Sequence, residues 1–313
     1  MSAHLLIGVG AGLVSAALFT SAAMSAMVLG LVLYLCPLPL CLAGLGWGRQ
    51  SIAVAGLVGS AVPLLFLGLG PALIYMATIA LPTVLLVYLA LQYRTAPDPA
   101  GGADPIVYWY PMGRLVAAAT ILAGTIATLM VLSLGPDMAS YSAFIDGLMP
   151  VIHDAMSSSD VVWTEEMTDQ FKTLIGRALP AVMAIVWSTI ALFNIWLAGK
   201  IAKGSGHVLR PWPDLHALEL PNAMVIAFAL SLALSFVPGL LGLIATGFTG
   251  AFMFAYLLQG LSIIHFYTLG MPFRAGLLAV LYLAILFLGW VAIIVAILGL
   301  SEPLLGLRAR MGR

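Results

Sequence analysis

Charged side chains are scarce in this chain of 313 residues: Asp, Glu, Lys and Arg make up 8% of it, against 63% hydrophobic residues. A soluble globular protein is roughly a quarter charged, because polar side chains must cover its surface. The mean hydropathy of +1.13 points the same way. The composition therefore excludes a soluble globular protein and predicts that lipid surrounds most of the chain. Since 12 basic residues balance 12 acidic ones, there is no overall positive charge to attract a nucleic acid.

Cysteines and catalytic motifs are also scarce. Cys36 and Cys41 lie in an apolar run, and their spacing, with no His or acid beside them, is not that of a common zinc site. The sequence lacks a phosphate-binding glycine loop, a zinc-protease helix and an esterase nucleophile motif. We therefore expect no enzyme activity, no catalytic residues, no cofactor and no metal. The remaining alternative is an enzyme acting at the membrane surface, which would use His153, Asp154 and Glu165, or His207, Asp214 and His216.

Long apolar stretches dominate what the chain does contain. A helix needs about 20 apolar residues to cross the roughly 30 Å of hydrocarbon in a bilayer. The stretches predict an all-α, polytopic transmembrane helical bundle with eight or nine spans, in a single integral membrane domain over residues 1–313. They are residues 4–21, 24–47, 51–69, 71–93, 113–135, 178–199, 222–246, 248–269 and 275–300.

The segments that connect these stretches differ in charge. Seven of the twelve acids lie in residues 136–177. Because loops rich in Lys and Arg stay in the cytoplasm, the basic segments are predicted inside and 136–177 outside. Nine crossings would leave the basic carboxy-terminal residues outside, whereas a segment of 222–269 that enters and returns near Pro238 and Gly239 would leave eight. The basic residues between stretches are Arg49, Arg94, Arg114, Lys200, Lys203, Arg210 and Arg274.

The acidic segment 136–177 carries two amphipathic patterns. Apolar residues recur every three or four positions from Met138 to Met156, which is typical of a helix with one apolar face. A second helix is predicted after Asp160, with Glu165 and Glu166 in its first turn, where the helix dipole favours negative charge. We expect a helical pair at about 138–177 that lies on the outer membrane surface or, alternatively, covers a cavity beneath it.

Few polar side chains lie inside the apolar stretches, and no Asp, Glu, Lys or Arg lies in the middle of one. Gln259, Ser262 and His265 are three residues apart, so they share one side of a helix and are expected to point into the bundle. With Tyr256 and Asn194 they form our candidate binding site for a small or lipidic molecule. The alternative is that these side chains only form hydrogen bonds to neighbouring helices.

Small residues recur every four positions in the first stretch, at Gly8, Gly12 and Ala16. Such a ridge lets a second helix approach closely. That helix can belong to another subunit, which makes the ridge a candidate docking surface, or to the same chain. The pattern alone leaves both interpretations open.

Three short segments carry a resemblance to a known family. Together with a carboxy-terminal Leu-Arg-Ala-Arg, they resemble the YybS-like family of uncharacterised bacterial multi-pass membrane proteins over most of the chain, apart from 136–177. That family is distantly similar to the substrate-binding subunits of energy-coupling-factor transporters. Those subunits have about six spans, fewer than are expected here. The segments are Leu35-Cys-Pro-Leu-Pro-Leu, Arg210-Pro-Trp-Pro-Asp-Leu-His-Ala-Leu-Glu-Leu-Pro221 and Ala255-Tyr-Leu-Leu-Gln-Gly-Leu-Ser-Ile-Ile-His265.

The resemblance implies a protein that binds a small molecule within its helical bundle and docks onto a partner that couples it to ATPases, with Gly8, Gly12 and Ala16 as the docking ridge. We therefore expect a small-molecule or lipid-binding transport subunit of the bacterial inner membrane, without an ATPase of its own. Its expected partners are the lipid bilayer, another membrane subunit and the ligand. The alternative is a non-transporting scaffold or assembly factor that docks onto another membrane complex.

Overall fold

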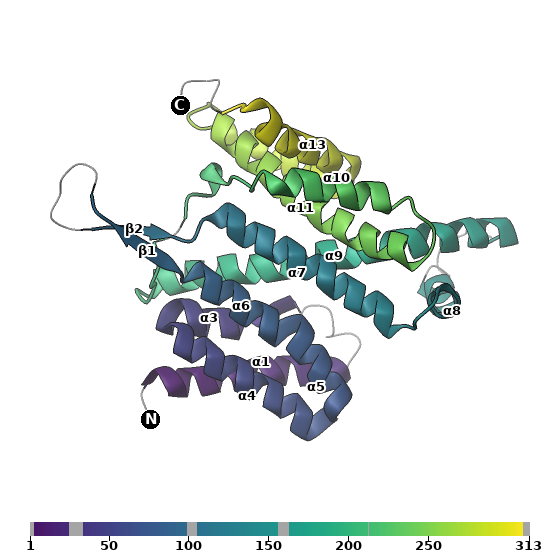
Figure 1. Ribbon diagram of the computed structural model, residues 1–313, viewed down its shortest axis with the longest axis horizontal. Coiled ribbons are helices and arrows are strands. Elements are labelled where there is room, and N and C mark those ends of the chain that lie inside the picture. Colours follow the sequence, from purple (N-terminus) through teal and green to yellow (C-terminus); the bar gives the residue numbers. More distant parts are fainter. Residues whose placement is uncertain (1–2, 25–33, 99–104, 156–162, 212, 309–313) are drawn as a thin grey trace. The chain divides into compact units, whose positions relative to one another are not determined.

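The computed structural model describes residues 3–24, 34–98, 105–155, 163–211 and 213–308. Nearly all regular structure within these ranges is helical, and the only sheet there is a two-stranded antiparallel hairpin (Figure 1). Six of these helices are long and apolar enough to cross a membrane, or seven if one bent pair counts as a span. The predicted class, an all-α polytopic helical bundle, is confirmed, but the eight or nine spans expected exceed the six or seven candidates among the described residues.

Contacts within the chain define two compact units. Unit 1 comprises Met1–Ala119 and Thr189–Glu219, and unit 2 comprises Thr120–Ser188 and Leu220–Arg313. The helices α7 (Met112–Ser133) and α9 (Glu165–Gly204) contribute residues to both units. Each unit is thus assembled from segments that are far apart in the sequence.

In unit 1, the helix Ala3–Met24 (α1) packs closely against the helix Arg49–Leu67 (α4). A methyl group at Gly12 would lie 2.5 Å from the Ala55 carbonyl oxygen, and Ala16 is fully buried. The ridge predicted as a docking surface is therefore covered within its own unit, as the second interpretation of the pattern allowed. The elements of unit 1, besides parts of α7 and α9, are α1 (Ala3–Met24), α3 (Pro37–Trp47), α4 (Arg49–Leu67), α5 (Leu69–Tyr75), the π-helical η1 (Met76–Ala80), α6 (Leu81–Ala90), β1 (Tyr93–Ala96) and β2 (Ile106–Trp109).

Two glycines separate helices of unit 1. Gly48 and Gly68 have φ angles of 94° and 89°, which a residue with a Cβ rarely adopts. The break predicted at residues 48–50 is confirmed at Gly48, between α3 and α4. After Gly68, α5, η1 and α6 run together as one apolar segment, Leu69–Ala90. Of the predicted stretch 24–47, residues 25–33 lie outside the described residues.

The outward side of α4 shows what surrounds this unit. Leu57, Leu65 and Phe66 are 74%, 79% and 78% exposed. A soluble protein rarely leaves so many large apolar side chains in contact with water, whereas lipid solvates them at no cost. Unit 1 therefore has the surface of a membrane-embedded protein.

Unit 2 has a core of small side chains. Ala123, Ala127, Ala184 and Ala251 form a buried cluster, with Trp187 packed against it. Small residues allow the helix backbones to approach closely, which is the usual way to gain packing contacts in lipid. Besides parts of α7 and α9, the elements of unit 2 are α8 (Met138–Ala155), α10 (Ala223–Leu234), α11 (Leu240–Tyr267), α12 (Arg274–Phe287) and α13 (Trp290–Leu305).

In the carboxy-terminal third, the helices differ from the predicted spans in two places. No break occurs at 246–248, because α11 continues through it with Gly247 against Ala127. The break lies instead at residues 235–239, where Pro238 and Gly239 suggested one, so that α10 is only 12 residues long. The predicted span 275–300 is not one straight helix, because α12 and α13 meet at a bend of 117°.

The acidic segment is helical, but it is not a separate pair of helices. The first amphipathic helix is α8, and its apolar face buries Tyr141, Ile145 and Met149. The second is the beginning of the 40-residue α9, which continues through Pro180. The predicted start at Asp160 lies outside the described residues. The separation expected at residue 177 is wrong, because a proline that usually interrupts a helix is accommodated here.

A tyrosine from α8 compensates for Pro180. Proline has no N–H, so the carbonyl four residues earlier, that of Gly176, loses its helical donor. The Tyr141 hydroxyl donates to the Gly176 carbonyl at 2.7 Å. Burial raises the pKa of Tyr141 to about 12, so the hydroxyl keeps its proton at neutral pH. The hydrogen bond ties α8 to α9 at the point where α9 would otherwise have an unpaired carbonyl.

We expect Tyr141→Phe to lower the free energy of unfolding by about 1–2 kcal/mol, the cost of leaving the Gly176 carbonyl unpaired. The loss should be smaller in a Pro180→Ala background, because the alanine at position 180 supplies the missing helical N–H. Thermal melting of the four proteins in detergent measures this. Equal losses in both backgrounds would show that the tyrosine acts by packing alone.

Candidate functional site

Arg210 is the buried charged side chain of unit 1 in the part of the chain that the structure describes, with 9% of its surface exposed. Its Nη1 donates to the Ala90 carbonyl and its Nη2 to the Tyr110 carbonyl, each at 2.9 Å. Ala90 ends α6, and the last carbonyls of a helix lack helical partners and form the negative end of its dipole. The guanidinium therefore closes the end of α6 and joins it to the residue that follows β2.

The connector that carries Arg210 is fixed along the end of α3. The Leu209 amide donates to the Leu45 carbonyl at 3.3 Å, and the His207 ring stacks on Trp47 with 5.3 Å between centroids. Arg210 thus occupies its position because α3, α6 and the hairpin all contact one short segment. The two hydrogen bonds of Arg210 join residues 120 and 100 positions apart.

Cations and aromatic rings gather at this end of unit 1. Arg49 reaches the Leu91 carbonyl at 3.5 Å, next to the carbonyl that Arg210 binds. Rings under cations are typical of a membrane–water interface, where an amphipathic ring is favoured. The pairs, at 5.5–5.9 Å from cation to ring centroid, are Arg49 with Tyr88, Arg94 with Tyr108, Lys200 with Trp196 and Arg210 with Trp109. We call this region the basic end of unit 1.

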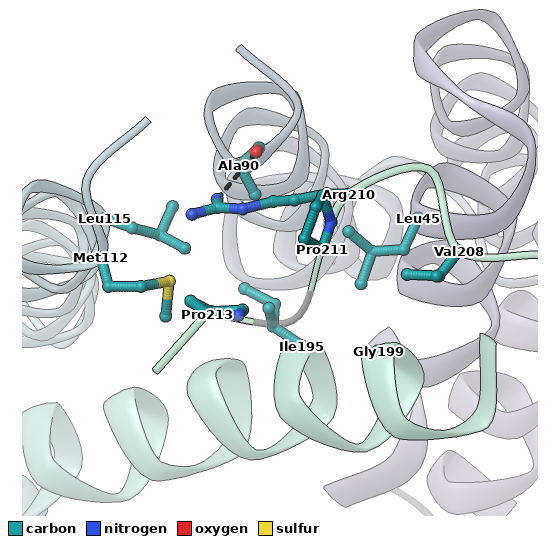
Figure 2. Close-up of a pocket in the computed structure, with 10 residues that line it drawn as sticks. All are labelled: Leu45, Ala90, Met112, Leu115, Ile195, Gly199, Val208, Arg210, Pro211 and Pro213. Atoms are coloured by element: carbon teal, nitrogen blue, oxygen red, sulfur yellow. Dashed lines mark hydrogen bonds between the residues drawn. The ribbon is translucent and has the colours of Figure 1, made fainter. Parts of the chain in front are cut away.

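A recess opens beside the Arg210 guanidinium (Figure 2). Its walls come from α3, α6, α7, α9 and the connector, and apart from the guanidinium they are almost wholly apolar. The cavity volume is about 30 Å³, which has room for a water or a small polar group and is far below that of a site enclosing an organic molecule. The lining residues are Leu45, Ala90, Met112, Leu115, Ile195, Gly199, Val208, Arg210, Pro211 and Pro213.

The charge of Arg210 has no acidic counterpart among the described residues. No carboxylate lies within ion-pair distance of it, and its buried Nε has no hydrogen-bond partner. Asp214, four residues away, accepts from the His216 amide and ring instead, at 2.9 and 2.7 Å. Burial lowers the pKa of Arg210, but an arginine stays charged at neutral pH. Arg210 therefore lines an apolar recess and carries a positive charge with one buried donor that has no partner.

The residues predicted to bind a ligand form contacts within the protein. Gln259 is 1% exposed; its Oε1 accepts from the Leu220 amide at 2.7 Å and its Nε2 donates to the Gly299 carbonyl at 2.8 Å. The Gly299 carbonyl has no helical donor, because the residue four positions later is Pro303, which has no N–H. Gln259 thus resembles Tyr141 in pairing a carbonyl that a proline leaves free.

The other predicted residues lie on the same helix or in the other unit. Ser262 and Tyr256 are buried in α11, with Tyr256 against Phe228. The His265 Nε2 lies 2.8 Å from the Tyr282 hydroxyl. Asn194 belongs to unit 1, where its Nδ2 donates to the Tyr34 and Ile190 carbonyls at 2.6 and 2.7 Å. Hydrogen bonds to neighbouring segments satisfy the Gln259 side chain and the Asn194 Nδ2 group.

Sequence reasoning did not select Arg210. The sequence marks it as a basic residue of a connector predicted to be cytoplasmic and as the first residue of a segment that carries the family resemblance, and basic residues in such loops are usually solvated. The available signal was its setting, between Leu209 and Pro211 and two residues before Trp212, because an arginine flanked by apolar residues is often held against the protein. Trp212 itself lies outside the described residues.

A family of membrane proteins matches almost the whole chain. Its sequence model, described as "Predicted membrane protein (DUF2232)", matches residues 13–301. The chain belongs to this family. No curated protein and no solved structure matches the chain. The DUF2232 match includes both units, the connector with Arg210 and the crossing of α11 and α13. Family membership and the apolar helices together establish a multi-pass membrane protein.

Proposed function

We propose that this DUF2232 protein binds a lipid-like molecule at the basic end of unit 1 and serves as the non-enzymatic, ligand-binding subunit of a transport system in the bacterial inner membrane. The observation that carries the proposal is the apolar recess beside the buried Arg210, whose Nε has no partner. Burying a charge in an apolar setting is costly unless it is paired. A ligand that pairs it would recover part of that cost.

The size of the recess favours a lipid-like ligand. At about 30 Å³ it admits a small group but not a whole metabolite. The rest of the ligand must lie outside the recess, where exposed apolar side chains such as Leu85 of α6 face the lipid. A molecule with one polar group and an apolar tail fits both surfaces.

Transport would require a partner. The chain has no nucleotide-binding motif, so energy must come from another subunit, as the resemblance to energy-coupling-factor transporter subunits also suggests. The ridge of Gly8, Gly12 and Ala16 is covered by α4, so a partner would dock elsewhere. The alternative is a scaffold or assembly factor, which would purify with a protein partner and without a bound lipid.

The test is to purify the full chain in mild detergent and identify what remains bound by mass spectrometry of the extracted material. We expect about one lipid-like molecule per chain. In Val208→Phe, which enlarges a side chain at the recess, retention should fall severalfold, because steric filling of a binding pocket excludes the ligand. Leu209→Phe is the matched control, since Leu209 is 47% exposed and does not line the recess.

Two results would overturn the proposal. One is purification without a bound lipid but with a stoichiometric protein partner, which would favour the scaffold. The other is equal lipid retention by Val208→Phe and Leu209→Phe, which would place the bound lipid away from the recess.

A further inference from the structure

We propose that Arg210 binds the phosphate oxyanion of an anionic amphiphile, of the kind carried by a phospholipid headgroup. This inference rests on the proposed function and identifies the chemistry of its ligand. Figure 2 shows the guanidinium at the edge of the recess, bound on one side to the Ala90 carbonyl. The recess is thereby bordered by a cationic group and, on its other sides, by apolar side chains.

Some N–H groups of Arg210 bind backbone carbonyls, and others are left to bind a ligand. The two hydrogen bonds to Ala90 and Tyr110 fix the plane of the guanidinium, which has five N–H donors in a rigid fork. Nε is buried and unpaired. A guanidinium held in this way is preorganised, so an incoming oxyanion need not order a flexible side chain before it binds.

The surrounding charges favour an anion over a neutral group. Unit 1 contains six basic residues, namely Arg49, Arg94, Arg114, Lys200, Lys203 and Arg210, and four acidic ones, namely Asp98, Asp104, Asp214 and Glu219. A neutral hydrogen-bond acceptor would satisfy the Nε donor, but it would leave the positive charge uncompensated. An oxyanion compensates both, and charge-assisted hydrogen bonds are roughly twice as strong as neutral ones.

The position of the site favours a lipid over a soluble anion. Trp109 and Trp196 are paired with cations here, as expected at the level of lipid headgroups. Basic pockets between helices on the cytoplasmic side bind anionic headgroups in other membrane proteins. The apolar walls around Leu115 and Ile195 would contact an acyl or glycerol portion but would gain nothing from free phosphate.

The test is native mass spectrometry of the full chain, titrated with phosphatidylglycerol and with diacylglycerol that has the same acyl chains but no phosphate. The wild-type protein should bind phosphatidylglycerol about tenfold more tightly, the ratio expected for one charge-assisted contact. Arg210→Gln should abolish this preference. Arg177→Gln removes the same charge from an exposed position in unit 2 and should change the preference less than about twofold. Inorganic phosphate serves as the soluble-anion probe.

The outcomes separate this inference from the proposed function. Equal binding of the two lipids by the wild type, with both weakened by Val208→Phe, overturns the oxyanion assignment and leaves the lipid-binding function standing. If the protein binds inorganic phosphate but neither lipid, the lipid-binding function is overturned, and the assignment of an oxyanion site to Arg210 is kept. A preference retained by Arg210→Gln overturns the inference. If that variant does not fold, the wild-type ratio and its reduction by inorganic phosphate decide.

Discussion

Replacing Gln259 with leucine should lower the free energy of unfolding by about 2–4 kcal/mol, because the change leaves two buried backbone groups unpaired. These are the Leu220 amide and the Gly299 carbonyl, which Gln259 joins across 39 and 40 residues of sequence. Most side-chain hydrogen bonds in membranes contribute less, about 0.6 kcal/mol, since the groups find other partners. The Gly299 carbonyl cannot do so, because Pro303 has no N–H.

A double-mutant cycle tests that explanation. Pro303→Ala gives α13 a backbone N–H four residues after Gly299, so that the carbonyl regains a helical donor. Gln259→Leu should then cost about 1–2 kcal/mol less in the Pro303→Ala background than in the wild type. Ser262→Ala, one turn further along the same helix, is the control for loss of a buried polar group. Unfolding by denaturant in detergent gives the free energies.

The result that would contradict this account is a Gln259→Leu variant as stable as the wild type, or one equally destabilised in both backgrounds. In the first case neither backbone group would depend on the glutamine. In the second, the loss would come from the leucine side chain fitting poorly between α11 and α13, and not from the freed carbonyl.

Gln259 illustrates how far the sequence leads in this protein. Its isolation in an apolar stretch predicted that it would be buried, and it is 1% exposed. Its partners were not predictable from spacing, because they lie on two segments that meet α11 only in the folded chain. The prolines were the missed signal: Pro180 and Pro303 each free one carbonyl in a helix, and such carbonyls need a donor from another helix.

The class of fold follows from composition alone, whereas the bends do not. An apolar helix in lipid has the same hydropathy whether it is straight or broken, so hydropathy did not distinguish one span in 275–300 from α12 and α13 at 117°, although Gly289 lies at the bend. The break before α11 was visible because Pro238 and Gly239 have backbone preferences of their own. Gly and Pro residues therefore indicated where a helix ends, whereas the absence of polar residues between two helices did not.

The candidate site was less predictable than the fold. Arginine is a common residue type in a loop predicted to be cytoplasmic, and the burial of Arg210 results from contacts with Ala90 and Tyr110, which lie 120 and 100 residues away. The positive-inside rule predicted that this segment lies on the cytoplasmic side of the membrane. Only the tertiary structure shows that one of these cations is enclosed while Arg94 is exposed.

The crossing of α11 and α13 should be the position most sensitive to added volume. A methyl group at Gly260 would overlap the Val295 carbonyl, and one at Gly299 would overlap the Tyr256 carbonyl. Both obstacles are helix backbone, which cannot rotate away as a side chain can. We expect Gly260→Leu or Gly299→Leu to cost about 3–5 kcal/mol, above the usual 1–3 kcal/mol for an enlarged core residue, and to reduce the yield of folded protein.

Gly276→Leu provides the control, because no atom lies within 4 Å of a methyl group at that position on α12. It should not destabilise the protein, since leucine has a higher helix propensity than glycine and α12 has no buried residues. Melting temperatures in detergent compare the three variants. Wild-type stability of Gly299→Leu would show that α13 can move away from α11, and the Gln259 hydrogen bond to the Gly299 carbonyl would then be lost as well. The two glycines and Gln259 are therefore expected to act together, as parts of one contact.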